Sequence, residues 1–69
     1  MAADRATAVR AALDALPERQ KQAVALRHFE DLGNPEIAEV MEISVEAVES
    51  LLSRGRRALA TALRGRDDV

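Results

Sequence analysis

The stretch NPEIAEVMEISVEAVESLL, residues 34–52, decides the fold of this chain because it predicts two helices joined by a tight turn. Asn34 is expected to cap the first helix and Pro35 to take its first position, which together form a strong helix start. Ser44 is a favourable cap for the second helix. The turn between the two helices is therefore expected at residues 42–44.

The spacing of small and apolar residues in this stretch is that of a helix-turn-helix. Two helices that cross at a steep angle need a small residue where they meet, and Ala38 supplies it. Ile43 is the apolar residue of the turn, and Val48 anchors the second helix. Glu42 departs from the pattern, because glycine is usual where the backbone turns left-handed and another residue costs about 1 kcal/mol there. In such a unit the second helix lies in the major groove of DNA.

Outward from this unit, the periodicity of apolar residues predicts an all-α fold with two further helices. Pro17 ends one helix near Leu16 and takes the first position of the next. Gly33 suits a left-handed residue at the end of that second helix. The four helices are expected at about residues 5–15, 17–30, 35–41 and 45–64, in a single domain over residues 1–69 with a flexible tail at 65–69.

One face of each longer helix is expected to form the core. In the second helix the buried residues are expected to be Ala23, Val24, Leu26 and Phe29. The fourth helix carries one apolar face and contains Gly55, which is expected to permit close packing against another helix. That apolar face consists of Val45, Val48, Leu52, Leu59 and Leu63.

Composition limits what other chemistry the chain can hold. It contains no cysteine and a single histidine, His28, so neither a disulfide nor a metal site is expected. No nucleophile stands near His28, so neither enzyme activity nor a cofactor is expected. No apolar run reaches the roughly 20 residues that cross a bilayer, and no signal peptide is expected at the N-terminus. A reducing, cytoplasmic setting fits these features.

The net charge of −2 conceals an uneven distribution of charged residues. From residue 34 to 49 every charged residue is a glutamate, and from residue 50 to 66 every charged residue is an arginine. This order complements a helix dipole, which favours acids at the N-terminus and bases at the C-terminus. The arginines also suit the phosphates of a nucleic acid.

Two segments of the chain resemble a known family. LDALPERQKQAVALRHFEDL (residues 13–32) and NPEIAEVM with ISVEAVESLLSRGRRAL (residues 34–41 and 43–59) are similar to region four of bacterial sigma factors, extracytoplasmic-function type. The resemblance covers about residues 10–64. It implies a four-helix domain with a helix-turn-helix, of winged-helix-like or sigma region-four type.

The resemblance also implies a function and partners. Such a domain recognises the minus-35 element of double-stranded promoter DNA and docks on the flap of the RNA polymerase β subunit. Anti-sigma factors often mask it, and it works at the bacterial nucleoid in the cytoplasm. A complete sigma factor needs a second domain that opens DNA, so the chain resembles the C-terminal domain or a stand-alone relative.

The outward face of the fourth helix is the expected DNA-binding surface. Acids that face phosphates are repelled, but a glutamate can accept a hydrogen bond from the amino group of cytosine. Two roles therefore stay open for Glu46 and Glu49, namely base contact or complement to the helix dipole. Arg56 is expected to pair with an acid on a neighbouring helix. The expected DNA-binding residues are Ser44, Glu46, Ala47, Glu49, Ser50, Ser53, Arg54 and Arg57.

Two other functions share some of these features. The effector domain of LuxR-type response regulators has a four-helix plan and a similar Glu-Ile-Ala stretch. A protein-interaction module would use the acidic surface of residues 36–49 and the leucine-rich face of residues 45–63 to bind a partner such as an anti-sigma factor. The Leu16–Pro17 hinge and the RGRR segment of residues 54–57 favour the sigma interpretation.

Overall fold

The computed structural model describes the backbone of residues 2–67 and the side chains of residues 7–64. Four helices follow one another, and no strand occurs among the described residues. The all-α fold expected from the sequence is confirmed. The helices are α1 (Ala2–Asp14), α2 (Glu18–His28), α3 (Asn34–Met41) and α4 (Val45–Asp67).

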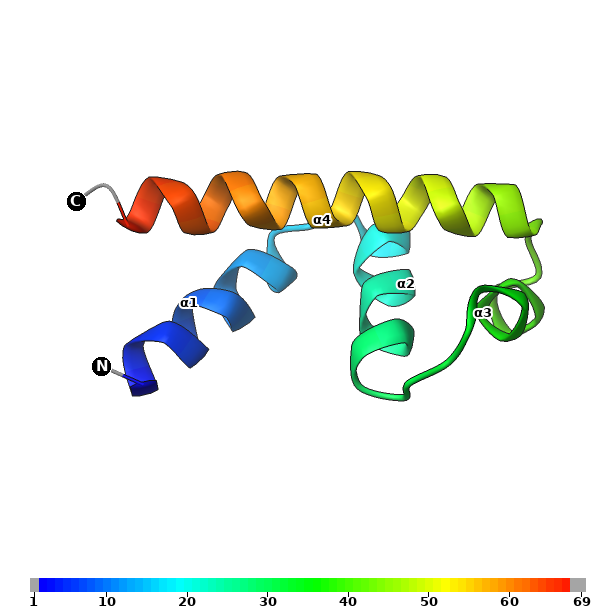
Figure 1. Ribbon diagram of the computed structural model, residues 1–69, viewed down its shortest axis with the longest axis horizontal. Helices are drawn as coiled ribbons and strands as arrows, with labels where there is room; N and C mark the ends of the chain where they lie inside the picture. The colour runs from blue at the N-terminus through cyan, green and yellow to red at the C-terminus, as the bar shows by residue number, and fades with distance from the viewer. Residues whose placement is uncertain (1, 68–69) are drawn as a thin grey trace.

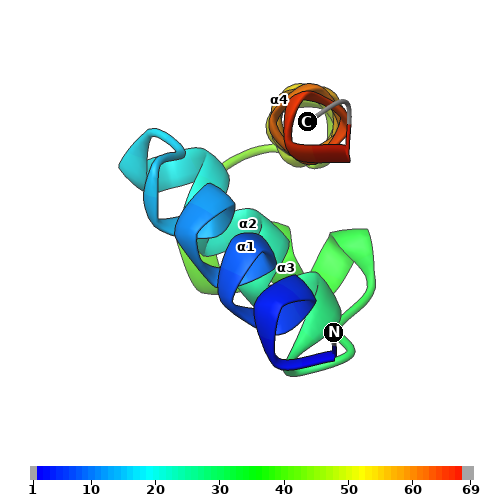
Figure 2. The same cartoon turned by 90° about the vertical axis from the view of Figure 1, so that its left-hand side faces the viewer.

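The long helix α4 runs along one side of the molecule, and the other three helices lie against its inner side (Figure 1). The start of α2 meets the middle of α4, α3 lies beneath the N-terminal end of α4, and α1 lies beneath its C-terminal half (Figure 1). Figure 2 looks along α4 and shows α1, α2 and α3 on one side of it. The opposite side of α4 is therefore uncovered along its length.

The core lies where α2, α3 and α4 meet. Ile37 and Val48 are fully buried, and they join the two helices of the predicted helix-turn-helix directly. Val24 and Leu52 are buried beside them, so α2 supports this unit from within. Ala38 is buried at the crossing, as its small size predicts. The whole core cluster comprises Leu16, Ala23, Val24, Ile37, Ala38, Met41, Val48 and Leu52.

The turn between α3 and α4 has the conformation that the sequence predicts. Glu42 is left-handed, with φ 58° and ψ 47°. The N–H of Ile43 donates to the carbonyl of Ala38 at 3.0 Å, which closes the end of α3. The hydroxyl oxygen of Ser44 accepts from the N–H of Ala47 at 3.1 Å and caps α4. These bonds hold α3 and α4 at a wide angle.

The connection between α2 and α3 differs from the prediction in two ways. The left-handed residue is Asp31 (φ 58°), whereas Gly33 is extended and caps α3. Asn34 is therefore the first residue of the helix, and its side-chain oxygen accepts from Nη1 of Arg27 at 3.2 Å. Glu36 is the physical reason, because its carboxylate accepts the N–H of Gly33 at 2.8 Å and so places the cap one residue earlier.

Several helix ends also differ from the predicted ranges. Pro17 precedes α2 as its cap, with φ −54° and ψ 147°, rather than occupying the first helical position. α2 ends at His28 and not near residue 30. α4 continues through Asp67, so residues 65–67 are helical where a flexible tail was expected. Residues 68–69 lie outside the described residues.

Two apolar side chains expected in the core are exposed. Phe29 is 71% exposed, because it follows the last residue of α2 and lies about 140° around the helix from Val24 at 100° per residue. Val45 is 36% exposed, because the first turn of α4 extends past the core. The placement of both residues in the core was therefore wrong.

Gly55 lies at a close approach of α4 to α2. A Cβ atom placed on Gly55 would stand 2.7 Å from Cγ2 of Val24, closer than two carbon atoms can approach. The same Cβ would stand 3.9 Å from both Cβ and the carbonyl oxygen of Gln20. The close packing expected at this glycine is confirmed.

Candidate nucleic-acid interface

The uncovered side of α4 presents a continuous exposed surface of polar side chains. Six of the eight residues predicted to contact DNA lie together there and line one shallow hollow. All six side chains are exposed, because the other helices pack only against the inner side of α4. These residues are Glu46, Glu49, Ser50, Ser53, Arg54 and Arg57.

The two remaining predicted residues stand at the start of α4, outside this hollow. The Ser44 hydroxyl oxygen accepts the N–H of Ala47, so the cap of α4 already uses it. Ala47 is half-buried and presents only part of its methyl group. Ser44 therefore has a demonstrated structural role in positioning the helix that carries the other six residues.

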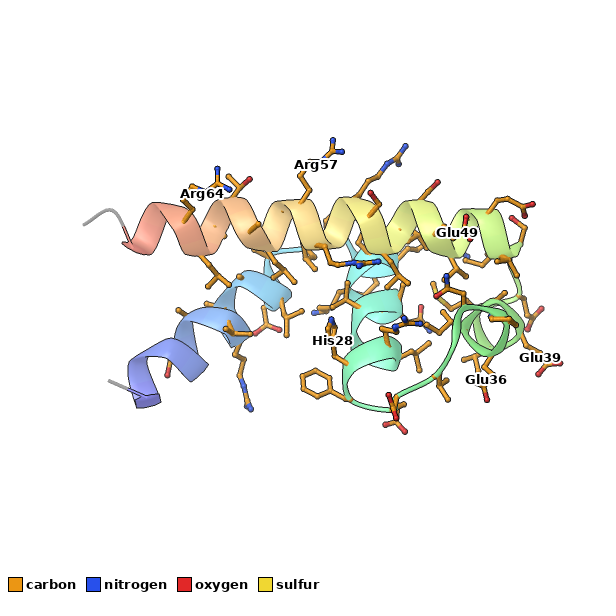
Figure 3. The ribbon with its side chains drawn as sticks, viewed as in Figure 1. His28, Glu36, Glu39, Glu49, Arg57 and Arg64 are labelled. Carbon is orange, nitrogen blue, oxygen red and sulfur yellow. The ribbon has the colours of Figure 1, made fainter. Side chains whose placement is uncertain are left out.

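The arginines of α4 have no acidic partner within the described side chains. One ion pair occurs among residues 7–64, between Nζ of Lys21 and Oδ1 of Asp14 at 3.7 Å. The expected pairing of Arg56 with an acid was therefore wrong, because Arg56 is exposed and none of the described acids lies within reach. Arg57 and Arg64 point away from the other helices (Figure 3). Their charges are free for an external anion.

The five glutamates of residues 34–49 do not share one surface. Glu36 and Glu39 project from α3, on the opposite side of the molecule from Arg57 (Figure 3). Glu46 stands in the first turn of α4, where a negative charge stabilises the helix dipole. Glu36 and Glu39 are thus remote from the uncovered side of α4, whereas Glu46 and Glu49 lie on it.

Sequence reasoning missed Gln20, the residue that α2 contributes to this surface. A second hollow adjoins the first along the line where α2 meets α4, and it shares Arg54 and Arg57 with it. Only the fold brings Gln20 of α2 beside the arginines of α4. This second hollow is lined by Gln20, Arg54, Arg57, Ala58, Thr61 and Ala62.

A third hollow lies between α1 and α2, and most of its surface is apolar. The exposed Phe29 and the half-buried Leu13 and Ala25 line it. The Lys21–Asp14 ion pair and Arg10 stand at its polar edge. We call this feature the α1–α2 groove.

The titratable side chains that could bind a metal ion are dispersed over the described part of the chain. His28 is exposed on α2 and lies apart from the acids of α3 (Figure 3). Residues 7–64 hold no cluster of three or more histidine, cysteine, aspartate or glutamate side chains that would bind a metal ion. None of the described helices is both long and apolar enough to cross a membrane.

Comparison with known proteins agrees with this geometry. The model of the family described as sigma-70, region 4 matches residues 6–59, which include α2, α3 and the N-terminal part of α4. A search of curated proteins finds no match. The family match favours the sigma interpretation over the LuxR-type alternative, and this family binds promoter DNA as part of sigma factors. The chain therefore belongs to the sigma-70 region 4 family.

Proposed function

We propose that this domain recognises the minus-35 promoter element as the C-terminal domain of an extracytoplasmic-function sigma factor. The observation that carries the proposal is the uncovered side of α4, where Arg54 and Arg57 have no acidic partner. The first turn of α4 is capped by Ser44 and held at an angle to α3, so the N-terminal part of α4 is free to enter a major groove. The domain would act at the nucleoid, in the bacterial cytoplasm.

The length of α4 divides its proposed contacts into two groups. Its 23 residues extend for about 34 Å, whereas the major groove is about 12 Å wide. The N-terminal part, which carries Glu46, Ala47, Glu49 and Ser50, would therefore lie along base edges. Ser53, Arg54 and Arg57 would follow the phosphate backbone, which sets position and much of the affinity.

Replacing both Arg54 and Arg57 with alanine tests this proposal. Each arginine that neutralises a phosphate contributes about 0.9 to the slope of log affinity against log salt, so the double variant should lower the slope by about 1.8. The measurement is a titration of promoter duplex at several salt concentrations. Arg10→Ala removes the same charge from α1 and serves as the matched control.

The two outcomes separate clearly. A slope that falls in the double variant and stays at its original value in Arg10→Ala supports the proposed DNA surface. An unchanged slope in the double variant rejects it, because the two guanidinium groups would then not contact phosphate.

The α1–α2 groove is the proposed contact with RNA polymerase. Family membership implies an interaction with polymerase, and the groove has the apolar lining and exposed aromatic side chain common in protein interfaces. It lies between α1 and α2, and both of these helices are on the inner side of α4 (Figure 2). We assign it to the β-subunit flap, which would leave α4 free for DNA.

A second candidate function, binding of an anti-sigma factor, is favoured by the outer face of α3. Val40 is 54% exposed there and stands one helical turn from Glu36, and the exposed Glu39 precedes it in the chain. Such a face suits a partner that carries basic and apolar side chains. If the domain binds no promoter duplex at low salt, protein binding becomes the better account of the site.

A further inference from the structure

The second hollow on α4 combines a largely apolar surface with four polar side chains. It is lined by side chains from two helices, with Gln20 from α2 and the rest from α4. Arg54 and Arg57 bring two positive charges, and Gln20 and Thr61 bring an amide and a hydroxyl group. None of its six lining residues is acidic, whereas the adjoining first hollow contains Glu46 and Glu49. An anion would therefore meet repulsion in the first hollow and none in the second.

The donors of the second hollow are not used within the protein. The hydrogen bonds between described side chains leave the amide of Gln20 without a partner. Arg54 and Arg57 lie outside the single ion pair of residues 7–64. Gln20 is half-buried and lines the hollow together with the arginines. A ligand with several acceptor oxygens would satisfy all of these groups together.

The close packing at Gly55 brings Gln20 next to α4. The space that a Cβ of Gly55 would occupy lies 3.9 Å from Cβ of Gln20, so α2 and α4 approach closely at this pair. Arg54 precedes Gly55, and Arg57, Ala58 and Thr61 follow on the same side of α4 at spacings of three and four residues. The start of α2 meets the middle of α4 (Figure 1), so the first turn of α2 lies beside these arginines.

We propose that this hollow is a phosphate clamp, in which Gln20 of α2 together with Arg54, Arg57 and Thr61 of α4 holds one backbone phosphate of the promoter duplex. The proposal rests on the proposed DNA-binding function and adds to it a contact from outside the helix-turn-helix. Amide, hydroxyl and guanidinium groups are all donors to phosphate oxygens in protein–DNA complexes. The clamp fixes the orientation of α4 relative to the duplex, because it holds the duplex from α2 as well as from α4.

The charge at position 20 tests the clamp. Gln20→Glu places a carboxylate against the phosphate and should weaken duplex binding about tenfold at moderate salt. Gln20→Lys should strengthen binding and steepen the salt slope by about 0.9. Gln22→Glu and Gln22→Lys are the matched controls, since Gln22 is exposed on the same helix and lies outside the hollow. These two control variants should change the affinity far less. Circular dichroism at the titration temperature verifies that each full-length variant is folded.

Neutral phosphate analogues identify the contact itself. Each backbone phosphate of the duplex is replaced in turn by an uncharged methylphosphonate, and the affinity of each duplex is measured with the wild-type chain and with Gln20→Lys. One replacement should weaken binding of wild-type protein, and the same replacement should cost Gln20→Lys more.

The results distinguish failure of the clamp from failure of the proposed function. If Arg54→Ala/Arg57→Ala lowers the salt slope but the Gln20 and Gln22 variants behave alike, the clamp is rejected and DNA binding by α4 stands. If the wild-type chain binds no duplex at low salt, both proposals are rejected. Opposite effects of Glu and Lys at position 20, absent at position 22, support the clamp.

Discussion

Single residues set the angle between the two helices of the helix-turn-helix. Glu42 and Asp31 are the two non-glycine residues with positive φ among the described residues, and both have φ 58°. This conformation brings Cβ close to the following carbonyl oxygen, which costs roughly 1–2 kcal/mol for most residues. Aspartate adopts it more readily than glutamate does. The turn that positions α4 is therefore under local strain at Glu42.

Glu42→Gly should stabilise the domain, because glycine removes the strain of the left-handed conformation. After allowance for the greater freedom of glycine in the unfolded chain, we expect a gain of up to about 1 kcal/mol. In a domain of this size that gain corresponds to a melting temperature higher by about 4–8 °C. Thermal unfolding followed by circular dichroism measures it.

Asp31→Gly is the comparison for this measurement. Its φ equals that of Glu42, but its strain is smaller, so its gain should be smaller. A melting temperature that rises for Asp31→Gly and not for Glu42→Gly would contradict the account of the turn.

At the scale of elements, the packing of α2 on α4 depends on a missing side chain. Glycine within a helix usually costs about 1 kcal/mol relative to alanine, yet Gly55 lies inside the longest helix of the protein. The reason is steric, because a methyl group at this position would overlap Val24. Val24 is 1% exposed and β-branched, so it cannot move aside easily. Gly55 therefore lowers the helix propensity of α4 but permits the close contact between α2 and α4.

Gly55→Ala should therefore destabilise the domain, although alanine is the better helix former. Inserting a methyl group into a packed contact typically costs about 1–3 kcal/mol. The measurement is the free energy of unfolding from urea titration of the wild type, Gly55→Ala, Val24→Ala and the double variant. The double variant should lose less free energy of unfolding than the two single variants lose together, because Val24→Ala makes room for the new methyl group. A more stable Gly55→Ala single variant would show that the contact is not tight.

At the scale of the whole molecule, the fold separates two surfaces. Arg57 projects from one side of α4, and α3 with its glutamates lies on the other (Figure 3). The α1–α2 groove and its exposed Phe29 belong to the helices that pack on the inner side of α4. This separation would allow one small domain to hold DNA and a protein partner at the same time.

Phe29→Ser should weaken binding of the polymerase flap without changing the affinity for promoter duplex. An aromatic side chain at the centre of an interface contributes about 2 kcal/mol, which corresponds to about thirtyfold in affinity. Isothermal titration calorimetry with a peptide of the β-subunit flap measures the affinity for the flap, and titration of promoter duplex measures the affinity for DNA.

Val40→Ser is the control for the Phe29 variant. It also removes an exposed apolar side chain, but from α3 and outside the groove. Equal losses of flap affinity in both variants would contradict the placement of the flap in the α1–α2 groove. Because both residues are largely exposed, neither change should lower the melting temperature greatly.

The sequence by itself determined the helices, the helix-turn-helix and the polar side of α4. These features depend on interactions between near neighbours in the chain, such as the Ser44 cap, the left-handed residue at Glu42 and the apolar spacing of α4. The family resemblance rested on the same local patterns, and the family match over residues 6–59 agrees with it. Local chemistry was sufficient for these features because the residues that specify each of them lie within a few positions of one another in the chain.

Only the tertiary structure decided which side chains gather on each surface. Phe29 was expected in the core and is exposed, since burial depends on where α1 and α4 lie and not on hydrophobicity alone. Gln20 joins the arginines of α4 because α2 approaches Gly55 from a distant part of the chain. Arg56 has no described acid within reach. An ion pair between two helices forms only when the helices pack at a suitable separation, which the sequence of one helix does not specify. Contacts between distant segments follow from how the helices pack, and no periodicity within one helix specifies that.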